Sequence, residues 1–314
     1  MLNYTVTKKP TIGIPRALLF HSYGEKWIKF FDELGIKKTV LSPETNREII
    51  KRGVALSVDE ACFSSKLYIG HIDWLVNQQC DLIFVLRQEN TGIRQDFCPR
   101  IFAMYDVVRH TFPQAKLLHA DVNYIFRKRE VDAFTNIGKQ LGFSTQQSIS
   151  AFEVATKYFE LHRKKLIENQ LALLKQDGMK VLIVSHPYNT HDASIGQSIV
   201  NYFKSQGVIT LLADLVEPDI AKTNTRESYG KRVYWQINAN LLGGLEFYKP
   251  HVQGIVLVTT FPCGPDSVFN DMIINQTNDI PILSLMIDEL DASAGLQTRL
   301  ESFVDILQAK GGKR

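Results

Sequence analysis

The feature that most limits how this chain can fold is a pattern that occurs twice. A short apolar run, a proline, a stretch with helical spacing, a glycine and a second apolar run follow one another in residues 11–41 and again in residues 181–212, about 170 positions further on. The apolar runs are continuous rather than alternating, which is typical of parallel strands buried on both faces. The pattern therefore predicts an α/β protein built from repeated strand–helix–strand units.

The rest of the chain continues this rhythm. Further strands are expected at residues 81–86, 116–119, 254–258 and 282–287, and helices at residues 98–110, 152–176 and 295–307. At 314 residues the chain is long enough for two domains. We therefore expect two Rossmann- or flavodoxin-like domains with parallel sheets, residues 1–145 and 146–314, the second entered by the long helical pattern.

Composition excludes several classes of protein. Lys and Arg (36) barely outnumber Asp and Glu (33), a formal net charge of +3, and no long basic stripe is present, so a nucleic-acid binder is not expected. The apolar runs are shorter than the roughly 20 residues that a membrane helix needs. The first ten residues lack the apolar core of a secretion signal. These observations indicate a cytoplasmic protein that does not enter a membrane.

The four cysteines stand in different settings. Cys98 and Cys263 each follow a predicted strand, at the carboxyl edge where open α/β sheets bind ligands. Cys62 precedes a helical pattern, and a thiol at a helix start is favoured as thiolate. Cys80 precedes a strand, away from that edge, and is expected to be a buried structural thiol. The spacing matches no compact zinc motif, so structural thiols, a metal site and a nucleophile all remain open.

Other residues near the predicted strand ends are weaker candidates. Each has a structural alternative, such as capping a helix, forming a turn or lying solvated at the surface. Gly243-Gly244 is not expected to bind phosphate, because it lies in a helical pattern with no Lys-Ser/Thr after it. The catalytic candidates are Glu60, His186 and Asp288, and the substrate-binding candidates are Arg16, Tyr188, Asn189, Asp266 and Ser267.

A set of motifs follows a fixed order along the chain. The motifs are Ile12-Gly-Ile-Pro-Arg-Ala17, Val58-Asp-Glu-Ala-Cys62, Cys98-Pro-Arg100, His186-Pro-Tyr-Asn189, Phe261-Pro-Cys-Gly-Pro-Asp-Ser267 and Met286-Ile-Asp-Glu289. Together they resemble the acyl-CoA dehydratase activase-related family, also called CoA-substrate-specific enzyme activase, and the resemblance runs from about residue 11 to residue 307. That family is similar to the cluster-carrying subunits of 2-hydroxyacyl-CoA dehydratases and benzoyl-CoA reductases.

The resemblance implies an iron–sulfur cluster in the cleft between the two domains, of the 4Fe–4S type or a double cubane of eight irons. Its ligands would be Cys62, Cys98 and Cys263, leaving one iron open as a Lewis acid. The implied function is low-potential, radical reduction or dehydration of a CoA thioester or another small molecule, in anaerobic metabolism. Electrons would come from an ATP-dependent activator protein with its own cluster, and the chain would form a dimer.

Two alternatives to the iron–sulfur reductase or dehydratase function follow from the same residues. The chain is alternatively a non-catalytic iron–sulfur carrier that transfers electrons, or a metal-free protein that binds a small molecule and whose thiols only pack. Anaerobic iron and sulfide analysis separates the third possibility from the first two.

Overall fold

The computed structural model describes residues 9–92, 96–230, 233–290 and 293–311. The chain divides into two compact units, Met1–Arg163 (unit 1) and Lys164–Arg314 (unit 2). The division falls within the long helix α7 (Thr145–Leu174), and the expected boundary near residue 145 coincides with the first residue of that helix.

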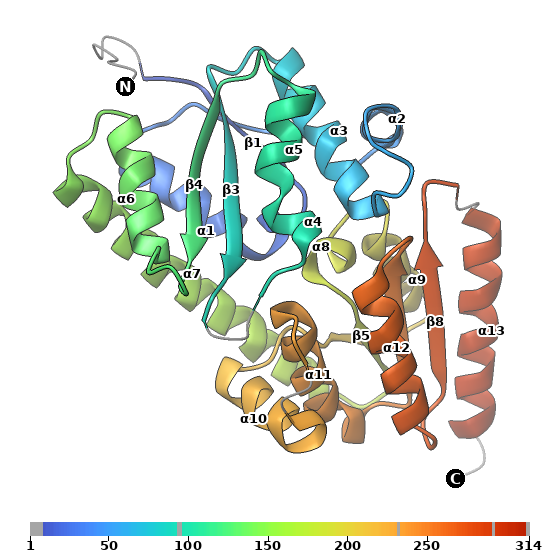
Figure 1. Cartoon of the computed structure of the whole chain (residues 1–314). Coiled ribbons are helices and arrows are strands. Elements are labelled where there is room, and N and C mark those ends of the chain that lie inside the picture. The colour runs from blue at the N-terminus through green and yellow to red at the C-terminus, as the bar shows by residue number, and fades with distance from the viewer. Residues whose placement is uncertain (1–8, 93–95, 231–232, 291–292, 312–314) are drawn as a thin grey trace. The chain divides into compact units, whose positions relative to one another are not determined.

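Unit 1 is a parallel sheet with helices on both faces (Figure 1). Its strands lie in the order β2-β1-β3-β4, and each pair of neighbours is parallel. Besides α7, its elements are β1 (Ile12–Ile14), α1 (Phe20–Glu33), β2 (Thr39–Leu41), α2 (Arg47–Ala55), α3 (Phe63–Asn77), β3 (Leu82–Asn90), α4 (Pro99–Phe102), α5 (Met104–Thr111), β4 (Leu117–Asn123) and α6 (Glu130–Gln140).

Aromatic rings form the core on one face of this sheet. Phe84 of β3 packs edge-on against Trp27 and Phe31 of α1 and lies beside Phe134 of α6. All four side chains are buried, and edge-to-face pairs add to the free energy gained from burial. On the opposite face of the sheet, Leu75 of α3 packs against Gly13 of β1. A Cβ atom at position 13 would lie 3.1 Å from the Leu75 side chain, so a larger residue there would crowd it.

Unit 2 repeats the arrangement. Its sheet has the order β6-β5-β7-β8, again with parallel neighbours. Its elements are β5 (Lys180–Val184), α8 (Pro187–Thr190), α9 (Gly196–Ser205), β6 (Ile209–Leu212), α10 (Pro218–Tyr229), α11 (Gln236–Tyr248), the 3-10 helix η2 (Lys249–His251), β7 (Gly254–Thr260), α12 (Gly264–Gln276), β8 (Ile282–Ile287) and α13 (Ser293–Gly311).

The apolar strands explain the core of unit 2. β5 and β7 are buried along their whole lengths, as expected for continuous apolar runs covered on both faces. Residues of α11 and α12 pack on one face of these strands. On the other face, α13 lies so close to Gly254 of β7 that an added methyl group would be within 3 Å of Phe303.

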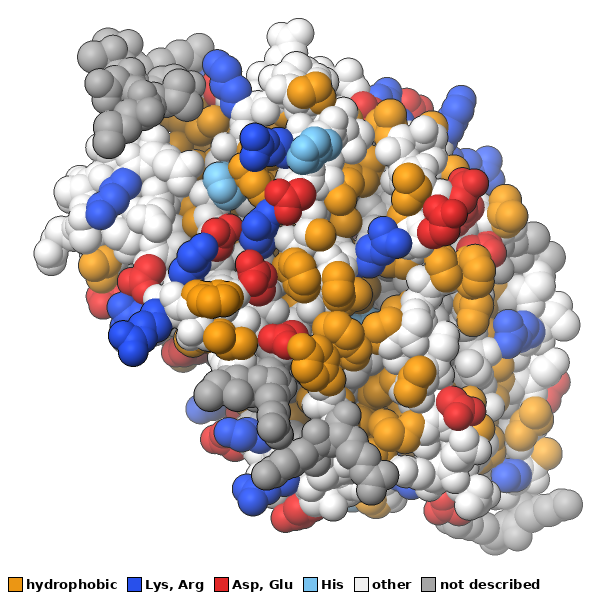
Figure 2. Space-filling model, viewed as in Figure 1, with side chains coloured by type: hydrophobic (Ala, Val, Ile, Leu, Met, Phe, Trp, Pro, Cys, Tyr) orange, Lys and Arg blue, Asp and Glu red, His pale blue; other side chains and the backbone are white. Residues whose placement is uncertain are grey.

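The expected fold class is confirmed, because both units are parallel α/β sheets with the same strand order. One helix differs in detail: the pattern at residues 98–110 forms two helices, α4 and α5, which meet at Ala103. Within the described ranges, none of the helices combines the length and apolar character of a bilayer-spanning segment. On the face shown in Figure 2, acidic and basic side chains are intermingled.

Candidate functional site

A buried carboxylate organises the carboxyl edge of the sheet in unit 2. His186 donates from Nε2 to Oδ1 of Asp266 at 2.7 Å, and Asn238 donates to the same oxygen at 2.9 Å. Thr259 donates to the other carboxylate oxygen at 3.3 Å, and the Cys263 side chain also hydrogen-bonds to this carboxyl group. We call these five residues the Asp266 cluster.

The strand topology explains how residues so far apart in sequence meet. β5 ends one residue before Ser185, and β7, its parallel neighbour, ends at Thr260. The loops that follow neighbouring parallel strands leave from the same edge of a sheet. Ser185 donates to the carbonyl oxygen of Val258 at 2.6 Å, which fixes the two strand ends together.

The electrostatics of the cluster favour an ionised Asp266. Burial alone would raise the pKa of this carboxyl group, since only 3% of the residue is exposed. The charge of His186 and the hydrogen bonds from His186, Asn238 and Cys263 outweigh burial and hold the pKa below its ordinary value. The carboxylate therefore orients the imidazole and accepts a hydrogen bond from the Cys263 side chain.

Local helix geometry places the thiol. Cys263 is the N-cap of α12, and Asp266 lies three residues later, in the first turn. A carboxylate at that position is favoured by the unpaired N–H groups and the dipole of the helix. Ser267 donates its hydroxyl to the carbonyl oxygen of Cys263 at 2.8 Å. The Cys263 backbone is thus held on the same turn as the carboxylate.

Two of the predicted binding residues flank the cluster. The ring of Tyr188 stacks on His186 at a centroid distance of 4.8 Å. Asn189 is fully buried in α8. The other ring nitrogen of His186, Nδ1, is buried and has no hydrogen-bond partner within the described residues. An unsatisfied buried nitrogen is costly and marks this histidine for functional interest.

Unit 1 brings two of the predicted cysteine segments together. Cys62 is the N-cap of α3, and Cys98 is the N-cap of the short helix α4. Arg100 donates to the carbonyl oxygen of Glu60 at 3.2 Å, which links the two segments. The Cys62 sulfur lies 3.1 Å from the hydroxyl of Ser65. The Glu60 side chain is exposed, so it lies outside any enclosed site.

Arg16 takes part in a polar network behind that edge of unit 1. Its backbone N–H donates to the hydroxyl of Ser42 at 2.8 Å, and its guanidinium lies 3.8 Å from Glu44. His71 contacts the same Ser42 hydroxyl at 2.8 Å and Thr45 at 3.1 Å. The network joins the ends of β1 and β2 to α3, which is a structural role.

The last catalytic candidate, Asp288, lies in a turn, where it accepts from the backbone N–H of Leu290 at 2.7 Å. Cys80, which was expected to be a structural thiol, is half-buried beside Gly13. Burial is the first of the causes that raise the pKa of the Cys80 thiol, in keeping with its expected structural role.

Sequence reasoning missed two members of the Asp266 cluster, Asn238 and Thr259. Thr259 stands near the end of a predicted strand, so its position at the carboxyl edge was a usable signal. Asn238 is a buried polar residue on α11, and no nearby motif marks it.

The fold and the site define a class: proteins of two parallel α/β units in which polar groups gather where the strands end. Within that class the family is shown by sequence. The chain belongs to the family described as the CoA enzyme activase uncharacterised domain, whose model matches residues 11–216. The match covers the whole sheet of unit 1 and strands β5 and β6 of unit 2.

Solved structures with detectable similarity are remote. The SBP FpvC from Pseudomonas aeruginosa in complex with Mn2+ is 12% identical, with 98% of this chain and 100% of that chain covered and a TM-score of 0.28. The structure described as ZnuA is 10% identical, with 95% and 99% covered and a TM-score of 0.24. No curated protein matches the chain.

The family corrects the function expected from the sequence. We expected an iron–sulfur protein that reduces or dehydrates a CoA thioester, or a cluster carrier, and both expectations are wrong. The matched family is that of the activases of CoA enzymes, not that of the cluster-carrying dehydratase subunits. Within the part of the chain that the structure describes, no group of three or more His, Cys, Asp or Glu side chains is arranged to hold a metal ion.

The general context of CoA enzymes is confirmed by the same match. The assignment of Cys62, Cys98 and Cys263 as ligands of one cluster stays a prediction. Cys62 and Cys98 belong to unit 1 and Cys263 belongs to unit 2, and the structure describes each unit by itself.

Proposed function

We propose that this chain is a partner of a CoA-dependent enzyme and takes part in its ATP-dependent activation. The observation that carries the proposal is the family match over residues 11–216. Activation of another enzyme requires a surface that the partner recognises and a group that changes the partner's state. The carboxyl edges of the two sheets are the natural location for both, since α/β proteins place their ligands there.

The Asp266 cluster is the best candidate for the group that acts. Its carboxylate is buried yet ionised, and it holds one thiol and one imidazole in fixed positions. Perturbed, convergent groups of this kind mark functional sites more often than ordinary ion pairs do. Cys263 is partly exposed, and in this proposal its sulfur contacts the partner enzyme or its CoA thioester.

Three finer expectations belong to the same proposal. The ATP-binding component is a separate activator protein, the thioester handled by the complex is an acyl-CoA, and the protein works as a dimer in the cytoplasm. Size-exclusion chromatography with light scattering tests the dimer, and phosphate release from ATP by each component alone tests the separate activator.

The proposal is tested by complex formation with the partner. Tagged protein is recovered from cells that make it, the CoA-dependent enzyme that accompanies it is identified, and both are purified. Sedimentation velocity should then show a complex of the two purified proteins. If no CoA-dependent enzyme binds, with or without ATP, the proposal fails.

Matched variants locate the site. Asp266→Asn removes the charge that holds His186 and Cys263, and it should weaken activation of the partner while leaving the protein folded at 20 °C. Ser302→Ala is the control, because its exposed hydroxyl donates to the backbone oxygen of Thr298 within α13, outside the Asp266 cluster. Equal activation by the two variants would remove the Asp266 cluster from the proposal.

A further inference from the structure

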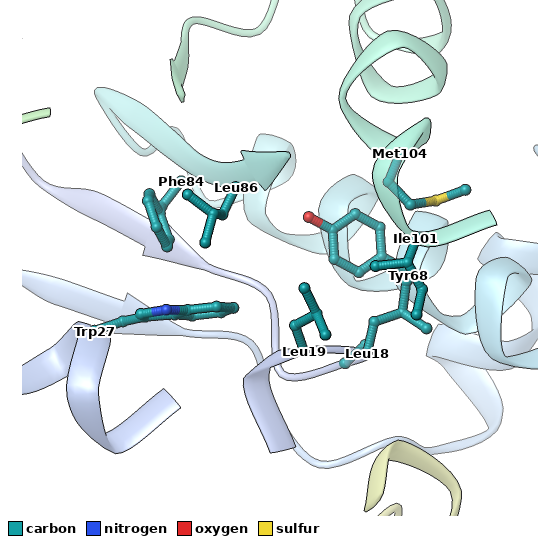
Figure 3. A pocket seen from close by; sticks show the side chains of 9 residues that line it. Leu18, Leu19, Trp27, Tyr68, Phe84, Leu86, Ile101 and Met104 are labelled. Carbon is teal, nitrogen blue, oxygen red and sulfur yellow. The ribbon is translucent and has the colours of Figure 1, made fainter. Parts of the chain in front are cut away.

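The apolar pocket at the carboxyl edge of unit 1 is too small for an organic ligand. It lies at the switch point of the sheet, where the chain leaves β1 for β2 on one side and returns to β3 on the other. Figure 3 shows the side chains around it, among them Trp27 of α1, Tyr68 of α3 and Leu86 of β3. Its volume is about 20 Å³, enough for about one water molecule. Contacts of unit 1 with larger partners are therefore expected on its outer surface.

Helix α7 (light green in Figure 1) presents an apolar stripe on that surface. Val154, Tyr158 and Leu161 have exposed fractions of 41%, 41% and 60%. They stand at positions i, i+4 and i+7 of the helix, so they are neighbours on one face. We call these three residues the α7 stripe. Apolar residues scattered singly over a surface need no partner, whereas adjoining ones mark an interaction site.

A different face of α7 already packs within unit 1. The ring of Phe159 lies 5.7 Å from that of Tyr23 of α1, and the ammonium group of Lys26 lies 4.5 Å from the ring centre of Phe152. At about 100° per residue, this packed face is about a third of a turn from the α7 stripe. The helix is thus anchored by one face while another holds the stripe at the surface.

Alternating charges border the stripe. Glu153, Lys157, Glu160 and Lys164 follow one another at spacings of four, three and four residues, and therefore form a row along the helix. All four residues are exposed. Lys164 lies 3.9 Å from Glu168, but no ion pair joins the first three charges of the row to any residue in the described ranges. These charges are thus available to a partner.

The order of the charges selects a second copy of this chain, in one direction. In an antiparallel pair of helices, a row on one border of the contact lies against the same row of the other copy. With the two-fold axis near Tyr158, Glu153 faces Lys164 of the second copy. Lys157 then faces Glu160 of the second copy, and the symmetry repeats both contacts. In a parallel pair each residue would face its own counterpart, and every contact would join like charges.

We propose that a second copy of this chain docks on the α7 stripe, so that two α7 helices pack antiparallel about a two-fold axis. Val154, Tyr158 and Leu161 are buried between the helices, and the charged rows border the contact. Burial of the apolar side chains supplies the affinity, and the charges set partner and direction. The inference rests on the proposed function for the expectation of a dimer, and it adds the surface that forms it.

Sedimentation equilibrium of the purified protein tests the apolar part. The wild type should be a dimer, and Leu161→Ser should weaken it at least tenfold, because an apolar side chain is lost from both copies. Leu173→Ser is the matched control: Leu173 is 38% exposed on the same helix, but it lies about a third of a turn from Leu161. A wild type that is monomeric up to about 0.1 mM, or equal dimerisation of the two variants, would overturn the proposal.

Two charge variants test the direction of the pairing. Lys157→Glu and Glu160→Lys each place like charges opposite one another, so each alone should dimerise about tenfold more weakly than the wild type at low salt. A parallel pair would exchange one like-charge contact for another, and the single variants would then dimerise as the wild type does, contrary to the proposal.

Mixing the two charge variants provides the complementary measurement. In a mixed antiparallel dimer both contacts join opposite charges again, so the mixture should dimerise as tightly as the wild type. A fluorophore on one variant lets fluorescence-detected sedimentation follow the mixed dimer. A mixture no tighter than either variant alone would contradict the pairing.

Folding and the activation role are separated from this inference. All the substituted positions are exposed, so the variants should melt within a few degrees of the wild type by circular dichroism. A wild-type dimer that both sets of variants leave intact would rule out α7 as the interface, while the dimer itself and activation of the partner enzyme would stand. These measurements contain no partner enzyme, so their failure is distinguishable from failure of the proposed function.

Discussion

At the scale of single residues, His71 links protonation to stability. The imidazole is fully buried, and burial, together with the nearby charges of His21 and Arg16, lowers its pKa from 6.5 to about 3. Its two nitrogens contact Ser42 and Thr45. The histidine is therefore neutral in the folded protein at any pH where the protein is normally handled, whereas the unfolded chain protonates it below about pH 6.5.

This difference predicts acid sensitivity. Between pH 6.5 and about 3 the unfolded state binds the extra proton, so the free energy of unfolding decreases as the pH falls, by up to about 1.4 kcal/mol per pH unit from this residue. Urea unfolding at pH 7 and pH 5 should show a smaller loss for His71→Asn than for the wild type. Parallel losses in the two proteins would mean that His71 titrates normally in the folded state.

Asp266 changes stability with pH in the same direction as His71, but over a lower pH range. Its folded pKa is lowered, so its contribution is present above the unfolded pKa near 4 and is lost as the pH falls through the folded value. Asp266→Asn leaves His186 without a charged partner, and it should lower the free energy of unfolding at pH 7 by about 3 kcal/mol. Ser267→Ala should change it by less than about 0.5 kcal/mol. Chemical denaturation measures both, and similar values for the two would contradict the arrangement.

Only part of the candidate site was predictable from sequence at this scale. His186, Tyr188, Asp266 and Ser267 stand in recognisable motifs after strands, and the structure brings all four to one edge of unit 2. The roles were less accessible, because a motif does not tell which buried acceptor a histidine will find. Asn238 illustrates this, since its contact with Asp266 depends on how α11 packs.

At the scale of secondary-structure elements, α11 shows why two adjacent glycines are needed in a helix. A Cβ atom at Gly244 would lie 1.7 Å from the carbonyl oxygen of Ala213, and one at Gly243 would lie 2.0 Å from that of Ala221. Both distances are shorter than any real contact. The glycines let α11 approach the backbone of neighbouring segments, which explains why this pair is no phosphate loop.

Gly244→Ala should therefore destabilise the protein, although alanine is the better helix former by about 1 kcal/mol. The clash is with backbone atoms, which cannot move aside easily. We therefore expect the free energy of unfolding to fall by about 1–3 kcal/mol, the usual cost of overpacking. Gly264→Ala is the matched control, since nothing lies within 4 Å of a Cβ there. Thermal unfolding compares them; a Gly244→Ala protein as stable as the control would show that the helix packs less closely.

The strands were the most predictable elements, because a short continuous apolar run that ends at a turn residue seldom forms anything other than a buried strand. β5, β7 and β8 start and end within two residues of the expected positions. Helices were harder. The break at Ala103 has no proline or glycine to signal it, and the short helix α8 begins with a proline that equally fits a turn. In both places tertiary packing decides what local sequence leaves open.

At the scale of the whole molecule, the repeated strand order gives the two units equivalent edges. The third strand in sequence of each unit is followed by a helix whose N-cap is a cysteine, Cys98 in unit 1 and Cys263 in unit 2. The equivalent switch points carry different chemistry. Unit 1 has an apolar pocket there, and unit 2 has a buried carboxylate with polar partners. The side chains at the equivalent edges are thus apolar in unit 1 and polar in unit 2.

The central claim is that the chain activates a CoA-dependent enzyme. The most direct measurement is the rate at which the purified partner enzyme converts its CoA thioester, with ATP and the activator present, before and after this chain is added. We predict a rate that rises with the concentration of the chain and saturates, and that falls when Asp266→Asn replaces the wild type. A rate that is the same with and without the chain would contradict the account.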